Sequence, residues 1–251
     1  MNNTKISIVI PAYNEEKNIA ATLENVVKEF NTYYLYEVVV VCDGCADKTS
    51  ENAKKVAQKY PQIQIYEYEE NRGKGYALTY GVKKAKGEIV SFFDAGGDFD
   101  VNHIDRFVKL MEVFDAHIVI GSKRHPASKV NYPVKRKFYS RIYQLMIKIL
   151  FNLNLSDTQT GIKIFKKEVL EQILPRAVVK KYAFDLELLV IANKFGYKKI
   201  FEAPVNLNYN FATSGIKFSS IWQMINDTFA IFYRLHFLRY YDKKHIKLRK
   251  E

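Results

Sequence analysis

Short, mostly apolar runs alternate with longer amphipathic segments over the first 121 residues of the chain. A short apolar run is typical of a strand buried on both faces, and apolar residues that recur every three or four positions are typical of a helix with one buried face. Because strands that alternate with helices form parallel sheets with right-handed crossovers, we expect an α/β fold with a mostly parallel sheet flanked by helices. The expected strands span residues 6–10, 37–41, 63–68 and 89–93, and the expected helices begin near residues 19, 48, 71 and 101.

The pattern changes after residue 121, where the chain becomes basic and then more helical. A helical apolar stripe covers residues 138–155, and a segment rich in lysine and arginine precedes it. A polar loop follows at residues 157–161. Beyond it we expect a strand over residues 162–165, a helix over 183–195, an extended segment over 199–209 and a long aromatic helix over 216–241, followed by a basic tail.

The charge of the chain favours an anionic partner. Its 251 residues carry a formal net charge of +12 at pH 7. Such an excess is typical of proteins that bind nucleic acid, a phosphorylated substrate or an anionic membrane surface. The basic residues are localised and no recognised nucleic-acid-binding motif is present, so we do not expect a nucleic-acid partner.

The lengths of the apolar runs and the small number of cysteines indicate where in the cell the protein is expected. No run reaches the roughly 18–20 apolar residues that a bilayer-spanning helix needs, and a strand begins where a signal peptide would carry its apolar core. We therefore expect a cytoplasmic protein, or one that lies on a membrane without crossing it. Cys42 and Cys45 are the only cysteines. Without a second pair they do not predict a zinc site, and we expect them to be reduced thiols.

A cluster of carboxylates follows the fourth predicted strand. Asp94, Asp98 and Asp100 would repel one another unless something neutralised them, and a divalent cation with oxygen ligands is the usual means. Gly96 and Gly97 would let the backbone turn sharply or approach a ligand closely. The alternative is a polar turn in which an aspartate caps the helix that begins near residue 101.

The other three strands also end in polar loops. They are followed by Asn14 and Glu15, by Asp43, and by Arg72-Gly73-Lys74-Gly75. The last of these turns opens a helix and is therefore a natural anion site. Since parallel strands end at the same edge of a sheet, where ligands of open α/β folds bind, the four loops together predict a site for a nucleotide and a metal.

Several segments resemble known enzymes. S-I-V-I-P-A-Y-N-E-E, V-V-V-C-D-G-C-A-D-K-T, N-R-G-K-G-Y-A-L and F-D-A-G-G-D are similar to motifs of family 2 glycosyltransferases, which have the Rossmann-like GT-A fold. G-S-K-R, S-D-T-Q-T-G-I-K-I-F, Y-A-F-D-L-E-L-L and S-G-I-K-F resemble the polyprenyl-phosphate sugar transferases, that is, dolichyl-phosphate glucosyl- and mannosyltransferases. The resemblance implies a GT-A catalytic domain over residues 1–215, with a nucleotide-binding half (1–121) and an acceptor-binding half (122–215). An amphipathic helix and a basic tail (216–251) would follow.

The resemblance also implies roles for individual residues. It places the nucleotide-sugar against Pro11, Ala12, Asn14, Glu15, Asp43, Arg72, Gly73, Lys74, Asp94, Ala95 and Lys217. It makes Asp94 the first acid of a D-x-D metal motif, implies Mg²⁺ or Mn²⁺ as cofactor, and directs Lys123 and Arg136 to the acceptor phosphate.

The chain departs from the D-x-D pattern at its second acid. That acid falls at Gly96, which has no side chain to ligate a metal. We expect Asp98, two residues further on, to replace it as a ligand. Asp100 is then left to cap the following helix.

The implied reaction is inverting transfer of a hexose from a nucleotide-sugar, UDP-glucose or GDP-mannose, to a polyprenyl (dolichyl) phosphate. A phosphate monoester has a second pKa of about 6, so it is largely a dianion at neutral pH and needs no strong general base. Catalysis would instead depend on a metal at the leaving diphosphate and on lysine and arginine side chains. The alternative is a family 2 transferase that acts on a sugar hydroxyl in a cell-envelope polysaccharide or glycan, which would need a general base.

Two acids of the helix over residues 183–195 are further candidates. Asp185 and Glu187 lie two positions apart, so they point in different directions. We expect Asp185 to line the catalytic site, and the alternative is an ordinary buried ion pair.

A polyprenyl acceptor would bring the enzyme to a membrane. The helices over residues 138–153 and 216–240 have the aromatic and basic composition of interfacial helices. We expect peripheral association with the cytoplasmic face of a membrane. The alternative is that both helices pack on the core or form a dimer interface, and the sequence leaves the oligomeric state open.

Overall fold

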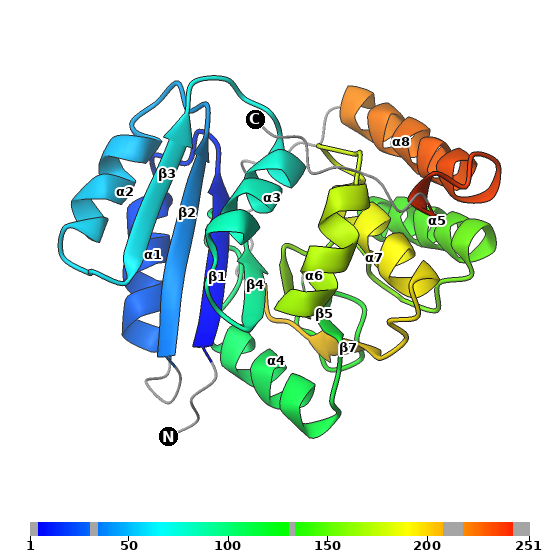
Figure 1. The fold of residues 1–251 in the computed structure, drawn as a ribbon, viewed down its shortest axis with the longest axis horizontal. Helices are drawn as coiled ribbons and strands as arrows, with labels where there is room; N and C mark the ends of the chain where they lie inside the picture. The colour runs from blue at the N-terminus through cyan, green and yellow to red at the C-terminus, as the bar shows by residue number, and fades with distance from the viewer. Residues whose placement is uncertain (1–4, 31–34, 131–133, 208–217, 243–251) are drawn as a thin grey trace.

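A single sheet runs through the molecule (Figure 1). The computed structural model describes residues 5–30, 35–130, 134–207 and 218–242, and of residues 134–138 and 218–219 it describes the backbone only. The sheet has seven strands in the order β3-β2-β1-β4-β6-β5-β7. These are β1 (Lys5–Ala12), β2 (Leu35–Asp43), β3 (Ile63–Tyr68), β4 (Ile89–Phe93), β5 (Ile118–Ser122), β6 (Ile162–Lys166) and β7 (Ile200–Pro204). The predicted mostly parallel α/β sheet is confirmed.

Strand direction decides which loops meet. The strands β1, β2, β3 and β4 are mutually parallel, β5 is parallel to β7, and β6 runs antiparallel between β4 and β5. Phe93 at the end of β4 therefore lies opposite Ile162 at the start of β6. As a result, the loops that follow β1–β5 and β7 and the loop that precedes β6 all lie at one edge of the sheet.

Helices cover both faces of the sheet. Alternate residues of a strand point to opposite faces, so Ile6, Ile8 and Ile10 pack with one set of helices while Val9 packs with the other. The first set is α1 (Ile19–Glu29), α2 (Thr49–Ala57) and α4 (Asn102–Val113). The second set is α3 (Lys74–Lys84), α5 (Val134–Phe151), α6 (Lys167–Ile173), α7 (Phe184–Lys194) and α8 (Phe218–His236). The 3₁₀ turns η1 (Leu174–Arg176) and η2 (Tyr240–Asp242) complete this layer.

Two helices end earlier than the apolar pattern predicts. Helix α5 stops at Phe151, because Asn152 has a left-handed backbone conformation (φ +51°). Helix α8 stops at His236 and the chain turns back at Arg239 (φ +46°), which buries Tyr241 completely. Tyr241, the last residue of the predicted helix, thus belongs to the core.

One short helix is absent from the sequence-based expectations, and some expectations fall on residues outside the described ranges. The seven-residue helix α6 was not predicted, because its apolar stripe is too short to give a periodic signal. Parts of the predicted extended segment (208–209) and of the last predicted helix (216–217) lie outside the described residues. None of the helices formed by described residues is long and apolar enough to cross a bilayer.

The two predicted halves of the catalytic domain share the sheet. Strands β1–β4 come from residues 1–121, β6 and β7 come from residues 122–215, and β5 spans the boundary. The assignment of nucleotide binding to one half and acceptor binding to the other stays a prediction.

Candidate active site

Six charged side chains meet at the sheet edge where the loops converge. We call them the lysine–aspartate network: Lys74, Lys123, Lys163, Asp94, Asp157 and Asp185. Lys74 Nζ lies 2.6 Å from Asp94 Oδ1, and Lys163 Nζ lies 2.8 Å from Asp185 Oδ1. Lys123 Nζ lies 3.6 Å from Asp157 Oδ2. Three positive and three negative side chains thus give the network no formal net charge.

The network is coupled beyond its three pairs. Burial opposes ionisation of Asp185, but Lys163 and Lys74 outweigh it and hold the pKa of Asp185 below its usual range. Burial would likewise lower the pKa of Lys74, but the carboxylates of Asp94 and Asp185 outweigh it and raise the pKa of Lys74. Asp185 therefore stays an anion and Lys74 a cation at neutral pH.

The metal loop follows β4. The side chain of Asp94 is 35% exposed, and its second oxygen faces Gly161, where a Cβ would lie 1.8 Å from Asp94 Oδ2. Asp98 Oδ2 lies 3.8 Å from the position that a Cβ on Gly96 would take. The carboxylate of Asp98 thus approaches the place where the family pattern has its second acid, which agrees with the predicted replacement. Its role as a ligand stays a prediction.

The donor set decides which kind of metal site is possible. Among the described residues, no three His, Cys, Asp or Glu side chains are grouped so that they alone could hold a metal. Magnesium, however, is usually bound through one or two carboxylates plus substrate phosphate oxygens and water. Asp94 and Asp98 therefore fit a cation that a diphosphate helps to hold, and do not fit a cage built from protein alone.

Asp100 caps the next helix as expected. Its Oδ1 accepts a hydrogen bond from the backbone N–H of Asn102, at 2.8 Å, and so satisfies a donor in the first turn of α4.

Asp43 holds the turn that opens α3. Its side chain is buried, and its two oxygens accept four hydrogen bonds. The donors are the Tyr68 hydroxyl (2.8 Å), the Asn71 amide (3.0 Å), and the backbone N–H groups of Arg72 (2.7 Å) and Gly73 (2.9 Å). Gly73 has φ +92°, a conformation that favours glycine. Asp43 thus positions the predicted anion site, and its contact with a base stays a prediction.

The loop after β1 is tied to the loop after β2. Asn14 Oδ1 accepts from the backbone N–H of Ala46 (2.9 Å), and the Cys45 thiol donates to the carbonyl of Ala12 (3.3 Å). The side chains of Ala12 and Ala95 are buried in the core, so only their backbone could meet a nucleotide. Pro11, Asn14, Glu15 and Arg72 remain partly or fully exposed at this edge.

The predicted acceptor residues are only partly visible. Lys123 belongs to the lysine–aspartate network, and its backbone N–H also donates to Asp157 Oδ2 at 3.1 Å. Arg136 lies in α5, but its side chain is outside the described part of the structure, and Lys217 lies outside it entirely. The roles of these residues stay predictions.

The two acids of α7 point in different directions, as predicted. Asp185 belongs to the network and forms a buried ion pair with Lys163, while its place in the catalytic site stays a prediction. Glu187 is fully buried on the other side of the helix. It accepts hydrogen bonds from the backbone N–H groups of Val178 and Val179 (2.7 Å each) and from the Tyr241 hydroxyl (2.7 Å), and Arg234 lies 3.4 Å away. Glu187 thereby joins α7 to α8 and to the turn at residue 241.

Sequence reasoning missed two members of the network. Lys163 has no exposed surface and also donates to the carbonyl of Thr160. The signal was present, since Lys163 is the one charge inside the apolar strand I-K-I-F, where an unpaired lysine would be costly. The sequence pattern marks Asp157 only as part of a polar loop.

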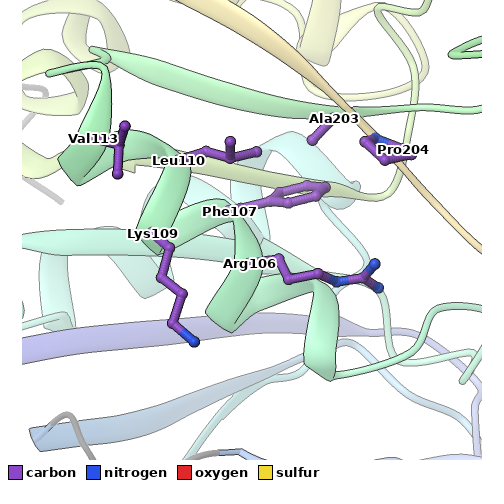
Figure 2. A pocket seen from close by; sticks show the side chains of 7 residues that line it. All are labelled: Arg106, Phe107, Lys109, Leu110, Val113, Ala203 and Pro204. Atoms are coloured by element: carbon purple, nitrogen blue, oxygen red, sulfur yellow. The ribbon is translucent and has the colours of Figure 1, made fainter. Parts of the chain in front are cut away.

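A separate hollow lies between α4 and β7 (Figure 2). It has a volume of about 350 Å³ and is lined by Arg106, Phe107, Lys109, Leu110, Val113, Ala203 and Pro204. None of the predicted site residues lines it. Nothing in the structure indicates what would fill it.

Comparison with known proteins identifies the family. The model of "Glycosyl transferase family 2" matches residues 7–174. Dolichyl-phosphate beta-glucosyltransferase ALG5A of Trichomonas vaginalis is 34% identical over 96% of this chain and 77% of its own length. The human dolichyl-phosphate beta-glucosyltransferase is 29% identical over 93% of this chain and 76% of its own.

A solved structure shows the same fold. Glucosyl-3-phosphoglycerate synthase from Mycobacterium tuberculosis, crystallised with Mn²⁺, UDP-glucose and phosphoglyceric acid, superposes with a TM-score of 0.68 at 18% identity. The match covers 92% of this chain and 79% of the other. The family match and the shared GT-A fold agree with the sheet and loops described above, and the chain belongs to glycosyl transferase family 2 and is a glycosyltransferase.

Proposed function

We propose that this glycosyltransferase transfers glucose from UDP-glucose to a polyprenyl phosphate such as dolichyl phosphate, with inversion at the anomeric carbon. The observation that carries the proposal is the match, over nearly the whole chain, to an enzyme named for β-glucosyl transfer to dolichyl phosphate. That similarity favours UDP-glucose over GDP-mannose, the two donors compatible with the sequence motifs.

The donor would bind at the turn held by Asp43. The N-terminus of α3 offers backbone N–H groups and Lys74 to a diphosphate. Asp94 and Asp98 would hold Mg²⁺ or Mn²⁺ there, and the bound cation would stabilise the charge on the leaving diphosphate. The Mn²⁺ and UDP-glucose in the structure of the fold relative support this arrangement.

The ion pairs favour a phosphate acceptor over a sugar hydroxyl. A hydroxyl acceptor would need a general base, and Asp185 is one buried carboxylate of the network that could take this role. Its Oδ1 is already bound to Lys163, and its lowered pKa makes it a weak base. A phosphate dianion needs no such base, and Lys123 with Arg136 would draw it toward the donor.

Helices α5 and α8 support membrane association. They lie next to each other at the end of the molecule away from β3, and the Tyr143 hydroxyl is 2.9 Å from Thr228 Oγ1 across their contact (Figure 1). Large hydrophobic side chains on and directly after them are about half exposed or more: Tyr139, Ile142, Leu145, Ile149, Trp222, Phe229, Tyr233, Phe237 and Leu238. Exposed Arg141, Lys148 and Arg239 accompany them, a composition that suits an anionic bilayer surface.

The transfer reaction can be tested directly. Purified protein is incubated with radiolabelled UDP-glucose or GDP-mannose, a polyprenyl phosphate and Mg²⁺ or Mn²⁺, and the lipid phase is counted. We expect metal-dependent labelling from UDP-glucose and a loss of at least about 100-fold for Asp94→Asn, since the variant loses its charge on the metal. Labelling of a polysaccharide but not of the lipid would contradict the proposal, and labelling from GDP-mannose alone would overturn the choice of sugar.

Membrane association needs its own experiment. Flotation with vesicles that contain anionic lipid should carry the protein, and neutral vesicles should carry less of it. Replacing Ile149 and Trp222 by serine should release it, while the same change at Val113, an exposed residue of α4, should not. A stable dimer that the Ile149 and Trp222 substitutions dissociate, with no vesicle binding, would show that the helices form an interface between copies instead.

A further inference from the structure

We infer that Lys74 holds the place of the divalent cation at Asp94 and gives it up only when cation and nucleotide diphosphate arrive together. This rests on the proposed donor site. It adds that the same lysine makes cation binding depend on the nucleotide, so that the enzyme does not take up the cation alone.

The two carboxylate oxygens of Asp94 have different neighbours. Asp94 Oδ2 faces the backbone of Gly161 too closely for even a methyl group to intervene. Asp94 Oδ1 is 2.6 Å from Lys74 Nζ. An ammonium therefore sits on the oxygen of Asp94 that does not pack against Gly161, and a metal bound at that oxygen would have to replace it.

The two cations exclude each other at that oxygen. Two unit positive charges about 4 Å apart repel each other at the effective dielectric of a protein surface, and a divalent ion doubles the repulsion. A metal ion bonded to Asp94 Oδ1 would lie closer than that to an ammonium still bound there. Lys74 must therefore move before the metal can bind.

Charge balance shows why the nucleotide matters. The lysine–aspartate network has no formal net charge and Asp98, the other proposed ligand, adds one negative charge, so a divalent cation alone would leave the site at about +1. The diphosphate of a UDP-sugar brings about two negative charges and offsets this excess. It also gives the displaced ammonium a new partner.

Lys74 is placed to make this exchange. It is the first residue of α3, directly after the turn at Arg72-Gly73, and its side chain is 37% exposed. The carboxylate of Asp185 also acts on it across the site. The side chain can therefore turn from Asp94 toward a diphosphate at the helix N-terminus without crossing the core.

The test is cation binding, measured without turnover. Free Mn²⁺ is titrated by electron paramagnetic resonance into wild type, Lys74→Met and Lys83→Met, each with and without saturating UDP. Lys83→Met removes the same charge near the other end of α3 and is the matched control. We expect UDP to tighten Mn²⁺ binding to wild type at least 10-fold. Lys74→Met should bind Mn²⁺ alone about 10-fold more tightly, with the effect of UDP reduced by a similar factor, and Lys83→Met should match wild type.

The outcomes separate this inference from the proposed function. If wild type binds Mn²⁺ with UDP but Lys74→Met binds Mn²⁺ alone no more tightly, the inference falls and the donor site stands. If wild type binds no UDP with Mn²⁺, the proposed donor site falls, and the inference with it. Lys74→Gln, which keeps a polar group at the site, should repeat the result of Lys74→Met, and circular dichroism confirms that both variants fold.

Discussion

Gly161 lies against Asp94 so closely that a Cβ on residue 161 would come within 1.8 Å of Asp94 Oδ2. The contact exists because β6 runs antiparallel beside β4, which puts the start of one strand next to the end of the other. The loop over residues 157–161 thus forms one wall of the site, and its last residue has to be glycine for Asp94 to keep its position.

Gly161→Ala should therefore disable the site. The added methyl group must push the Asp94 carboxylate away, and we expect transfer to fall at least about 100-fold with a matching loss of Mn²⁺ affinity. Gly96→Ala is the control, since its Cβ would meet only Asp98 and Glu15, at ordinary distances of 3.8 and 3.9 Å. Equal activity of the two variants would show that Asp94 does not need its observed position.

Gly96→Asp would restore the second acid of the D-x-D pattern. There is room for the side chain, but its charge would stand near Asp98 and Glu15. We expect the variant to be about 1 kcal/mol less stable than wild type without metal, because like charges repel, and to bind Mn²⁺ more tightly in the presence of UDP. Urea unfolding with and without Mn²⁺ measures both effects, and Gly96→Asn separates charge from size. Unchanged Mn²⁺ affinity would mean that Asp98 already fills the role completely, or that the metal lies elsewhere.

The sequence predicts the parts of this site better than their arrangement. Strands β3 and β4 begin and end at the predicted residues, and in β4 all five residues are buried and four of them are apolar. The four loops after β1–β4 follow from parallel pairing alone. The pairs Lys163–Asp185 and Lys123–Asp157 do not, because they depend on where β6 inserts in the sheet, and no local pattern encodes that position.

The contact of Gly161 with Asp94 also depends on how the strands pair and not on a local sequence pattern. The sequence motif marks Gly161 as part of a loop, but only the antiparallel pairing of β4 with β6 brings it to Asp94. Conversely, the helical stripes of α5 and α8 predicted the helices but not their ends, which left-handed residues and the burial of Tyr241 determine.

Lys163→Met should cost about 3–5 kcal/mol of unfolding free energy, because it leaves the buried carboxylate of Asp185 without its partner. Adding Asp185→Asn should recover part of the loss, since the buried charge is then gone. Urea unfolding of the two single variants and the double variant gives the coupling energy. Lys55→Met, which breaks an exposed pair with Glu51, is the control and should cost under about 0.5 kcal/mol. A Lys163→Met variant as stable as that control would refute the buried pair.

Asp43→Ala should loosen the turn before α3. Four donors lose their acceptor, two of them backbone N–H groups that are then left unsatisfied, and we expect a cost of about 2–4 kcal/mol together with weaker UDP binding. Isothermal titration with UDP and Mn²⁺ measures the binding. The control is Asp47→Ala, a partly exposed acid of the neighbouring loop that accepts hydrogen bonds from the start of α2 and not from the turn before α3, and UDP affinity should stay near wild type. If Asp43→Ala kept both stability and affinity, the turn would be held by other contacts.

His103 should make stability depend on pH. It is fully buried in α4; its Nε2 accepts from the backbone N–H of Asn206 (2.8 Å), so Nδ1 carries the proton and donates to the carbonyl of Asp100 (2.6 Å). Protonating Nε2 would place its N–H against the backbone N–H of Asn206, so that two donors would face each other. Burial also disfavours the charged imidazolium and lowers the pKa of His103. A histidine with a lowered folded pKa stabilises the fold above its unfolded pKa of about 6.5, and this contribution is lost as the pH falls through that value toward the folded pKa.

We expect the melting temperature to fall between pH 7.5 and pH 5.5, and to fall less in His103→Gln, although that variant is less stable at pH 7.5. His117, whose pKa burial also lowers, would account for part of the remaining slope. An identical slope in wild type and His103→Gln would show that His103 is not the group that titrates.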